Sequence, residues 1–164
     1  MTERYTFSLA EQTDCAAVLA VYHACVGLPG CTWSYDYPSQ ETFDTDVANG
    51  WLYCLKEAGA IIAVVSLGAF NELAEDGIAW HSQTRNPCEI GRIGVLPNRR
   101  GRGLGAQLLS LAIDAARQQR FDAMRLLVSP QNPPAVALYR RAGFRTVGEI
   151  DKFDKHWFCQ ELLL

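Results

Sequence analysis

Long hydrophobic runs are absent from this sequence of 164 residues. No stretch approaches the roughly 20 consecutive apolar residues that a helix needs to span a bilayer. The opening residues, Met-Thr-Glu-Arg-Tyr-Thr-Phe, contain no apolar segment of the kind that characterises a secretory signal peptide. We therefore expect a cytoplasmic protein with no membrane partner.

Paired cysteine spacings are also absent. The six cysteines, at positions 15, 25, 31, 54, 88 and 159, form no Cys-x-x-Cys motif. Without such motifs, neither a zinc site nor a disulfide framework is indicated. We expect buried, reduced thiols and no bound metal.

An excess of positive charge is lacking as well, because 15 Lys and Arg stand against 18 Asp and Glu, a net charge of −3. Proteins that bind nucleic acid over a broad surface usually carry a basic excess, so we expect no nucleic-acid partner. The remaining composition, with 49% hydrophobic and 20% charged residues, is that of a globular protein. A chain of this length is expected to form one domain, spanning residues 1–164.

One stretch, Glu89–Ala106, combines a strand, a basic glycine-rich turn and the start of a helix. Its first part is rich in β-forming residues, and Pro97 ends the strand because proline has no backbone N–H to donate. From Leu104 onward, apolar residues recur at helical spacing. The turn contains three glycines and three arginines: Gly101, Gly103, Gly105, Arg99, Arg100 and Arg102. Glycines let a backbone approach a ligand closely and free N–H groups at a helix start attract anions, so we expect a phosphate group to bind here.

Periodicity and turn residues predict strands and helices along the rest of the chain. We expect strands over 4–9, 51–56, 61–70, 124–129, 144–150 and 156–163, besides the one that starts near 89. We expect helices over about 14–25, 39–49 and 133–141, besides the one that starts at 104. The segments 31–38 and 71–86 have no clear period and are expected to be irregular.

Two motifs in the second half of the chain carry a family resemblance. The first is Arg100-Gly101-Arg102-Gly103-Leu104-Gly105, which fits the pattern Gln/Arg-x-x-Gly-x-Gly/Ala. The second is Asn-x-x-Ala-x-x-Leu-Tyr-x-x-x-Gly-Phe, matched at Asn132, Ala135, Leu138, Tyr139, Gly143 and Phe144. With both motifs in this order, the chain resembles the GNAT superfamily, the Gcn5-related N-acetyltransferases, over essentially its whole length. The resemblance implies an α+β, sandwich-like acyl-CoA N-acyltransferase (GNAT) fold: a mixed, mostly antiparallel sheet of six or seven strands flanked by about four helices.

The resemblance also implies the ligand, acetyl-coenzyme A. In the family, the pantetheine arm bonds to the backbone of the fourth strand, here Ile93, Gly94 and Val95. The pyrophosphate rests on the turn, here Arg100, Gly101, Arg102, Gly103, Leu104, Gly105 and Ala106, and further cofactor contacts come from Asn132 and Tyr139. The implied function is an acetyl-CoA-dependent N-acetyltransferase that moves an acetyl group to a primary amine, in a small molecule or peptide, by direct attack in a ternary complex.

Tyr139 and Glu89 are the catalytic candidates by the same resemblance. The family places a tyrosine at the position of Tyr139 whose hydroxyl protonates the departing thiolate; the alternative is that its ring only packs against the core. Several members place a glutamate at the position of Glu89 to deprotonate the amine through water. Strand alternation predicts Glu89 on the same face as Ile93 and Val95, where partial burial would raise its pKa. The alternatives are a solvated or Arg92-paired glutamate, and a site that uses ordered water with no dedicated base.

The acceptor pocket is the part that the sequence defines least. In this fold it usually lies between the first two helices and loops near the last strands. These segments here hold an acid and several aromatic residues: Asp36, Trp33, Tyr35, Tyr37, Trp80, Phe153 and Trp157. Trp33 and Tyr37 are our candidates for substrate binding, because an aromatic wall with one or two acids suits a small cationic amine or a peptide N-terminus. Packing under a loop explains the aromatics equally well, and the acids of 36–46, Asp46 included, also suit capping and surface positions.

Several alternatives stay open from the sequence alone. Cys88 with His81 or His23 would form a nucleophilic pair, although no Cys-His signature supports it and a buried thiol is the simpler interpretation. The chain could instead be a non-catalytic acyl-CoA-binding sensor or assembly module, or could bind phosphate or RNA through its arginine turn. Homodimers are common in the family that the chain resembles, and the sequence does not decide the oligomeric state.

Overall fold

The computed structural model describes residues 4–73, 77–81 and 83–164. Our expectations for the first three residues and for 74–76 and 82 of the irregular segment lie outside the described residues. The strands are β1 (Tyr5–Leu9), β2 (Leu52–Glu57), β3 (Ala60–Gly68), β4 (Pro87–Val95), β5 (Ala123–Val128), β6 (Arg145–Lys152) and β7 (Lys155–Leu163). The helices are α1 (Cys15–Cys25), α2 (Gln40–Ala48), α3 (Leu104–Gln118) and α4 (Pro133–Arg141), with short 3-10 helices at η1 (Gln12–Asp14) and η2 (Pro97–Arg99).

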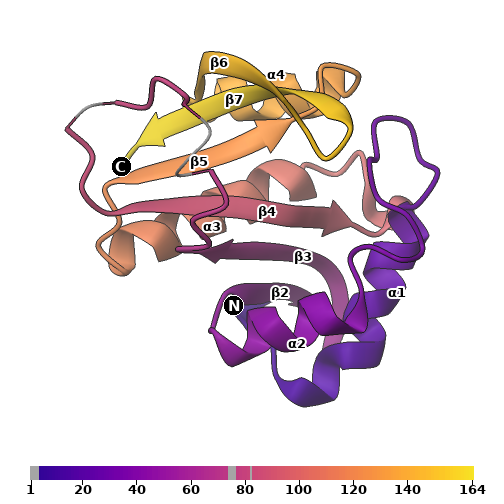
Figure 1. Ribbon diagram of the computed structural model, residues 1–164. Coiled ribbons are helices and arrows are strands. Elements are labelled where there is room, and N and C mark those ends of the chain that lie inside the picture. The colour runs from indigo at the N-terminus through magenta and orange to yellow at the C-terminus, as the bar shows by residue number, and fades with distance from the viewer. Residues whose placement is uncertain (1–3, 74–76, 82) are drawn as a thin grey trace.

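All seven strands belong to one sheet, in the order β1-β2-β3-β4-β5-β7-β6 (Figure 1). Every neighbouring pair is antiparallel except β4 and β5, which run parallel. The prediction of a mixed, mostly antiparallel sheet of six or seven strands with about four helices is confirmed.

The helices cover both faces of the sheet, and each face has its own core. α1 and α2 pack on one face through a cluster that includes Tyr22, Phe43 and Val64. α3 and α4 cover the other face through a larger cluster, to which Val65 of β3 and Tyr139 of α4 belong. Successive residues of β3 thus point to opposite faces, as in any strand that is buried on both sides. None of the helices in the described part of the chain is long and apolar enough to cross a bilayer.

β4 and β5 separate soon after they begin. Their parallel pairing covers three residue pairs and ends with Glu89 opposite Arg125, although β4 continues to Val95 and β5 to Val128. Figure 1 shows the two strands diverging toward the end of β4. Beyond Glu89, β4 therefore pairs with β3 alone, and the backbone groups on its other edge have no strand partner among the described residues.

β4 also contains a β-bulge. Ser66 pairs with Gly91 and Val64 with Gly94, so one residue of β3 lies opposite two residues of β4. One of these two, Arg92, has a φ of 44°, in the left-handed region that non-glycine residues rarely occupy. The extra residue reverses the alternation of side chains along the rest of the strand.

The bulge overturns the predicted face of Glu89. Cys88 and Ile90 belong to the cluster under α3, so Glu89 between them points to the α1–α2 face. Ile93 and Val95, beyond the bulge, contact the cluster under α3 as well. The expectation that Glu89 shares a face with Ile93 and Val95 is wrong because it assumed an unbroken alternation.

Candidate active site

The glycine-rich turn between β4 and α3 forms an open backbone cradle. Gly101 has a φ of 78° and Gly103 a φ of 74°, which glycine adopts without strain. Gly103 is the N-cap of α3 and brings no side chain to cap the first N–H groups of the helix. A Cβ added to either glycine would meet no described atom within 4 Å. The cradle is thus open toward a ligand, and the helix start favours an anion such as phosphate.

Two of the three arginines near this turn have partners inside the protein. The Arg100 Nε donates to the Val95 carbonyl oxygen at 3.2 Å, and its Nη2 lies 3.6 Å from the Cys25 Sγ. Arg99 forms an ion pair of 3.2 Å with a glutamate of β2. Arg102 is exposed. Backbone N–H groups, with Arg102 alongside, are therefore the donors best placed for a phosphate, while Arg100 fastens the turn to the end of β4.

The free edge of β4 leads directly into the cradle. Ile93, Gly94 and Val95 lie on β4 past its last pairing with β5. An extended ligand with amide groups could pair with their backbone as a neighbouring strand would. The predicted strand part of the cofactor site is therefore continuous with the predicted phosphate part.

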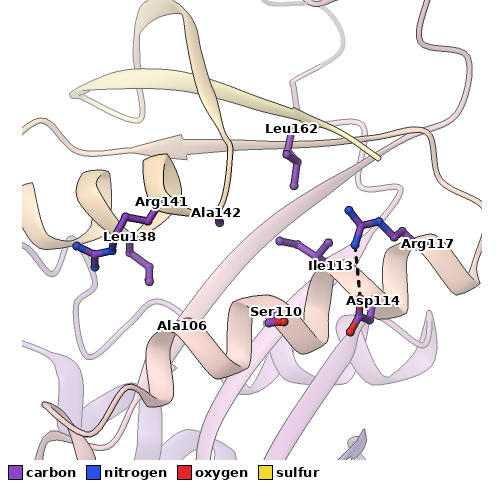
Figure 2. A pocket seen from close by; sticks show the side chains of 9 residues that line it. All are labelled: Ala106, Ser110, Ile113, Asp114, Arg117, Leu138, Arg141, Ala142 and Leu162. Carbon is purple, nitrogen blue, oxygen red and sulfur yellow. Dashed lines mark ion pairs between the residues drawn. The ribbon is translucent and has the colours of Figure 1, made fainter.

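A groove of about 290 Å³ lies between α3 and α4, beside the cradle (Figure 2). It is lined by residues of α3, by residues at the end of α4 and by β7: Ala106, Ser110, Ile113, Asp114, Arg117, Leu138, Arg141, Ala142 and Leu162. Ala106 belongs both to this groove and to the predicted pyrophosphate site.

Tyr139 lies near the end of α4, with 5% of its surface exposed. Its ring contacts Phe144 edge-on at a centroid distance of 5.6 Å, so the packing role that the sequence allowed is present. Burial raises the pKa of its hydroxyl to about 12. That hydroxyl makes no hydrogen bond with the residues described by the structure. Its role as an acid stays a prediction.

Asn132 begins α4 and uses both ends of its side-chain amide within the protein. Its Oδ1 accepts from the Ala135 N–H at 3.3 Å, as the N-cap, and its Nδ2 donates to the Gly30 carbonyl oxygen at 3.4 Å. A Cβ on Gly30 would lie 2.6 Å from the Asn132 side chain, so only glycine permits this approach. Asn132 thus fastens α4 to the loop between α1 and α2, and its contact with a cofactor stays a prediction.

Glu89 is buried, with 8% of its surface exposed, and holds the segment that follows β3. Its Oε2 accepts from the Glu72 N–H and its Oε1 from the Leu73 N–H, both at 3.0 Å. Burial raises its pKa, and the charge of Glu72 raises it further, although the backbone hydrogen bonds act in the opposite direction. The alternatives of a solvated Glu89 or one paired with Arg92 are wrong, while its role as a base stays a prediction.

Trp33 and Tyr37, the candidate acceptor residues, both reach the bulged part of β4. Trp33 packs edge-on against Tyr22 at a centroid distance of 5.5 Å. Its ring lies so close to Gly94 that a Cβ there would be 2.9 Å from it. The Tyr37 hydroxyl accepts from the Arg92 Nη1 at 3.3 Å. The structure therefore places both candidates beside the free stretch of β4.

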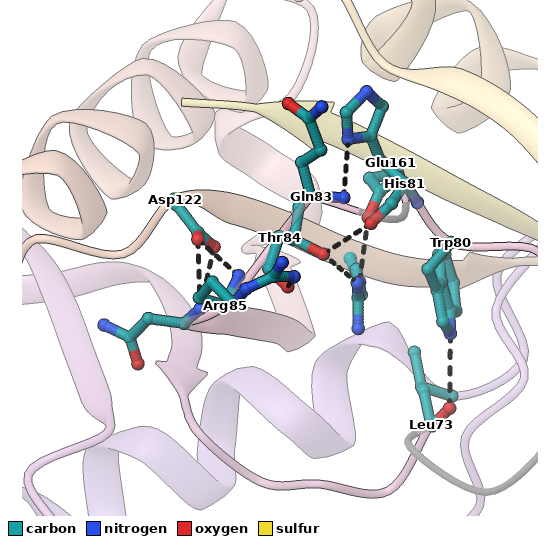
Figure 3. A network of polar contacts seen from close by, with 10 residues as sticks. Leu73, Trp80, His81, Gln83, Thr84, Arg85, Asp122 and Glu161 are labelled. Carbon is teal, nitrogen blue, oxygen red and sulfur yellow. Dashed lines mark hydrogen bonds and ion pairs between the residues drawn. The ribbon is translucent and has the colours of Figure 1, made fainter.

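The other aromatic candidates have different surroundings. Trp80 stacks on Arg125 at 4.8 Å and donates from Nε1 to the Leu73 carbonyl oxygen (Figure 3). Trp157 donates to the Lys152 carbonyl oxygen within the β6–β7 hairpin. The exposed ones are Tyr35 and Phe153. Within the described residues, none of these four contacts Arg92 or the bulge of β4 through an interaction of its ring.

Sequence reasoning missed an ion pair beside Tyr37. Asp46, expected as a capping or surface acid, is 1% exposed and pairs with Arg92 through an N–O distance of 2.8 Å. The Ser66 hydroxyl donates to the same carboxylate at 2.6 Å. Two sequence features suit burial of each residue, although neither identifies its partner: Asp46 follows Phe43 by three residues on one helix face, and Arg92 is the sole cation in a β-forming run.

Among the described residues, neither His81 nor His23 forms a hydrogen bond with Cys88. Cys88 is fully buried, and burial raises its pKa to about 12, which keeps the thiol protonated. The His81 N–H donates to Glu161 at 2.8 Å, and its Nδ1 accepts from the Gln83 N–H (Figure 3). His23 packs against a tyrosine ring. The simpler interpretation of Cys88 as a small buried thiol agrees with this environment.

Several curated acetyltransferases are similar to this chain. The mycothiol acetyltransferase of Clavibacter sepedonicus is 41% identical over 69 residues, which cover 42% of this chain and 23% of that protein, so the chain spans less than a quarter of that relative. The L-methionine sulfoximine/L-methionine sulfone acetyltransferase of Pseudomonas aeruginosa is 28% identical over 144 residues, 84% of this chain and 78% of that protein. The L-amino acid N-acyltransferase MnaT of Escherichia coli is 29% identical over 138 residues, with 82% and 76% covered.

Solved structures share the fold. The yncA protein of Salmonella typhimurium, solved with its cofactor acetyl-CoA, superposes with a TM-score of 0.74 at 23% identity, over 99% of this chain and 95% of that one. The phosphinothricin acetyltransferase of Sinorhizobium meliloti, in complex with acetyl-CoA, gives 0.74 at 23% identity, over 99% and 89%. A family model described as the acetyltransferase (GNAT) family matches residues 18–144, which include both sequence motifs. The chain belongs to the acetyltransferase (GNAT) family.

Proposed function

We propose that the protein is an acetyl-CoA-dependent N-acetyltransferase that acts on the primary amine of a small molecule by direct attack in a ternary complex. The observation that carries this proposal is the separation of β4 from β5, which leaves a free strand edge running into the cradle of Gly101 and Gly103. Family membership supplies the reaction class to which this arrangement belongs.

The residues present fit acetyl-CoA. Backbone N–H groups at the start of α3 would hold the pyrophosphate, and the free edge of β4 from Ile93 to Val95 would bind the amide groups of the pantetheine arm. The groove that starts at Ala106 would take the nucleotide end. Acetyl-CoA supplies the acetyl group already activated as a thioester, so the protein has only to position the acceptor and move protons.

Tyr139 would donate a hydrogen bond or a proton at the leaving sulfur. With a pKa of about 12, its hydroxyl is protonated at neutral pH and available as a donor. Because it makes no hydrogen bond with described residues, using it in this way breaks no existing bond.

Glu89 would accept a proton from the acceptor ammonium, through water. Its raised pKa moves it toward the range in which a base works near neutral pH, although both of its oxygens already accept backbone hydrogen bonds. Each carboxylate oxygen has a second lone pair, so a water can still bind.

The acceptor is proposed to be a small molecule, entering from the face where Trp33 and Tyr37 meet β4. Two relatives that match more than four fifths of this chain are named for amino-acid substrates or close analogues, which supports an acceptor of that size. A peptide acceptor is the second candidate, because a ribosomal-protein-alanine N-acetyltransferase of Brucella melitensis shares the fold.

The cytoplasm is the proposed location, because the six cysteines, all within the described residues, form no disulfide, as expected in a reducing compartment. A homodimer is the proposed assembly, through the outer edge of β6, which has only β7 as a strand partner in the part of the chain that is described. Sedimentation equilibrium tests the assembly.

Consumption of acetyl-CoA tests the function. The protein is incubated with acetyl-CoA and a pool of L-amino acids, and CoA is separated from acetyl-CoA by chromatography, which avoids thiol reagents that would react with its cysteines. We expect CoA to appear only when protein and amines are both present. Tight acetyl-CoA binding without turnover would favour the sensor module instead, and salt-sensitive RNA binding without CoA binding would favour the arginine-turn alternative.

A further inference from the structure

A guanidinium is held in one orientation on the α1–α2 face of β4. The Arg92 Nε donates to the Asp46 Oδ2 at 2.9 Å and its Nη2 to the Oδ1 at 2.8 Å, a two-pronged pairing. The Arg92 Nε also reaches the Ser66 hydroxyl at 3.3 Å. The ring of Phe70 lies 5.0 Å from the centre of the guanidinium. Only 8% of the Arg92 side chain and 2% of that of Asp46 are exposed.

The backbone of Arg92 adopts a strained conformation that directs its side chain toward α2. Its φ of 44° is unfavourable for a residue with a Cβ, and the bulge that contains it turns Arg92 toward α2 instead of the cluster under α3. Strained residues at bulges are often found where a strand presents a side chain to a ligand. Arg92 lies two residues before Gly94, on the free stretch of β4.

Arg92 retains hydrogen-bonding capacity after its internal bonds are counted. A guanidinium has five N–H groups. Asp46 takes one on Nε and one on Nη2, and Tyr37 takes one on Nη1, so one N–H on each terminal nitrogen has no partner among the described residues. The Tyr37 hydroxyl accepts from Arg92, so its own proton is available to a further acceptor. Tyr37 itself is 48% exposed, so its hydroxyl lies where the buried guanidinium comes nearest to an exposed side chain that it contacts.

A second unpaired polar group lies on the same side of the sheet. The hydroxyl of Tyr22 is buried and has no hydrogen-bond partner among the residues that the structure covers. Tyr22 belongs to the cluster under α1 and α2; burial and the charge of Asp46 raise the pKa of its hydroxyl, and the charge of Arg92 lowers it. Its ring meets Trp33, the other acceptor candidate, edge-on. Unpaired buried polar atoms are rare and call for a ligand or water.

We propose that the acceptor carries a carboxylate beside its amine, and that Arg92 and the Tyr37 hydroxyl hold this carboxylate. The inference rests on the proposed function and names the acceptor class: free α-amino acids. A preorganised guanidinium is the side chain best matched to the planar carboxylate. A peptide N-terminus is disfavoured, because the carboxyl group next to its amine is an uncharged amide.

A matched set of acceptors tests the proposal with the unaltered protein. Each L-amino acid of a small panel is compared with its amide and with the amine that lacks the carboxyl group, and kcat/KM is measured for each by mass spectrometry of the product. We expect loss of the carboxylate to lower kcat/KM by about 10- to 100-fold, the effect of a charge-assisted hydrogen-bond pair. Equal use of acids and amides would overturn the inference and leave the proposed function standing.

The variant Arg92→Lys tests whether Arg92 itself recognises the carboxylate of the acceptor. Lysine keeps a positive charge for the buried Asp46 but loses the planar fork, so we expect the acid-to-amide ratio of kcat/KM to fall to within about threefold of unity. Arg125→Lys is the matched control, because Arg125 also pairs with a buried glutamate, at 2.9 Å, and also stacks on an aromatic ring. Both variants lose stability for the same reason, but Arg125→Lys is expected to keep the ratio of the unaltered protein.

Two further outcomes would overturn the proposal that Arg92 holds the acceptor carboxylate. An unchanged ratio in Arg92→Lys would assign Arg92 to the structural tethering of α2 to β4 and overturn the proposal. Absence of acetylated product from every acceptor would overturn the proposed function and this inference together.

Discussion

At the residue scale, burial decides how Tyr139 can take part in proton transfer. A phenol with a pKa of about 12 is a weak acid toward a thiolate whose ordinary thiol pKa is about 8.5. The same desolvation acts on sulfur, since burial raises the pKa of the Cys54 and Cys88 thiols to about 12 as well. A thiolate that left in equally desolvated surroundings would be a matched acceptor for the Tyr139 proton, as proposed above.

Tyr139→Phe removes this donor and little else. We expect acetyl-CoA affinity to stay nearly unchanged and kcat to fall by on the order of 10²-fold. Isothermal titration and steady-state kinetics measure the two quantities. Tyr53→Phe is the control, because its hydroxyl accepts a hydrogen bond from Gln119 on the protein surface, and it should retain full kcat. Full turnover in Tyr139→Phe would remove Tyr139 from the mechanism and leave only the packing of its ring on Phe144.

If Glu89 is the base, kcat/KM should depend on pH in a defined way. A base with a raised pKa loses its function as pH falls through that pKa, so kcat/KM should decline on the acidic side at a pH above the ordinary glutamate value of about 4.5. Glu89→Gln should lower kcat/KM and abolish this acidic limb. Glu161→Gln is the control, because Glu161 is also buried and also accepts a backbone N–H, that of His81. An acidic limb that persists in Glu89→Gln would assign the base to ordered water.

The same raised pKa affects stability with a defined sign. A carboxyl group whose pKa is higher in the folded state stabilises the fold below its unfolded pKa, and this contribution is lost as pH rises through the folded pKa. The free energy of unfolding should therefore fall less between pH 4.5 and neutrality in Glu89→Gln than in the unaltered protein. Urea denaturation at a series of pH values measures the difference, and parallel curves would contradict it.

At the scale of single elements, the turn before α3 and the bulge of β4 position most of the proposed site residues. The turn follows from its sequence, since Pro97 and the glycines indicated both its place and its openness. The bulge does not, because Arg92 is an ordinary residue in a β-forming run and only pairing with β3 reveals the extra residue. Sequence alternation therefore predicts the wrong face for Glu89, and the sequence suggests a capping or surface position for Asp46 because its partner lies on a distant strand.

Gly103→Val tests the cradle. Valine at a φ of 74° should cost about 1–2 kcal/mol of stability and obstruct the phosphate site, so acetyl-CoA affinity should fall at least tenfold while the fold survives. Gly59→Val is the matched control, because Gly59 has a φ of 83° in the β2–β3 turn and equally open surroundings. Calorimetric titration should show normal binding in Gly59→Val. Equal loss of binding in both variants would point to a general effect of strain.

Asp46→Ala tests the link between α2 and β4. Removing one partner of a buried ion pair leaves the Arg92 charge without compensation, at an expected cost of roughly 3–5 kcal/mol in unfolding free energy. Asp114→Ala breaks an exposed pair of 3.6 Å with Arg117 on α3 and should cost less than about 0.5 kcal/mol. Similar denaturation midpoints for the two variants would contradict the importance assigned to the buried pair.

At the scale of the whole molecule, helices cover both faces of the sheet, and the residues proposed to bind the acceptor lie on one of them. α3 and α4 cover one face and α1 and α2 the other (Figure 1); Trp33 packs on the α1–α2 side, where Arg92 also pairs with Asp46 of α2. Strand and helix limits were predictable to within a few residues because periodicity and prolines such as Pro133 are local signals. The pairing of distant residues was not, because no local pattern encodes it.

Mass spectrometry of a mixed panel of primary amines, incubated with acetyl-CoA and the protein, tests whether the protein transfers acetyl groups. We expect at least one amine to become heavier by one acetyl group, in amounts equal to the CoA released. An unchanged panel, with acetyl-CoA intact and bound to the protein, would contradict acetyl transfer and leave a protein that only binds its cofactor.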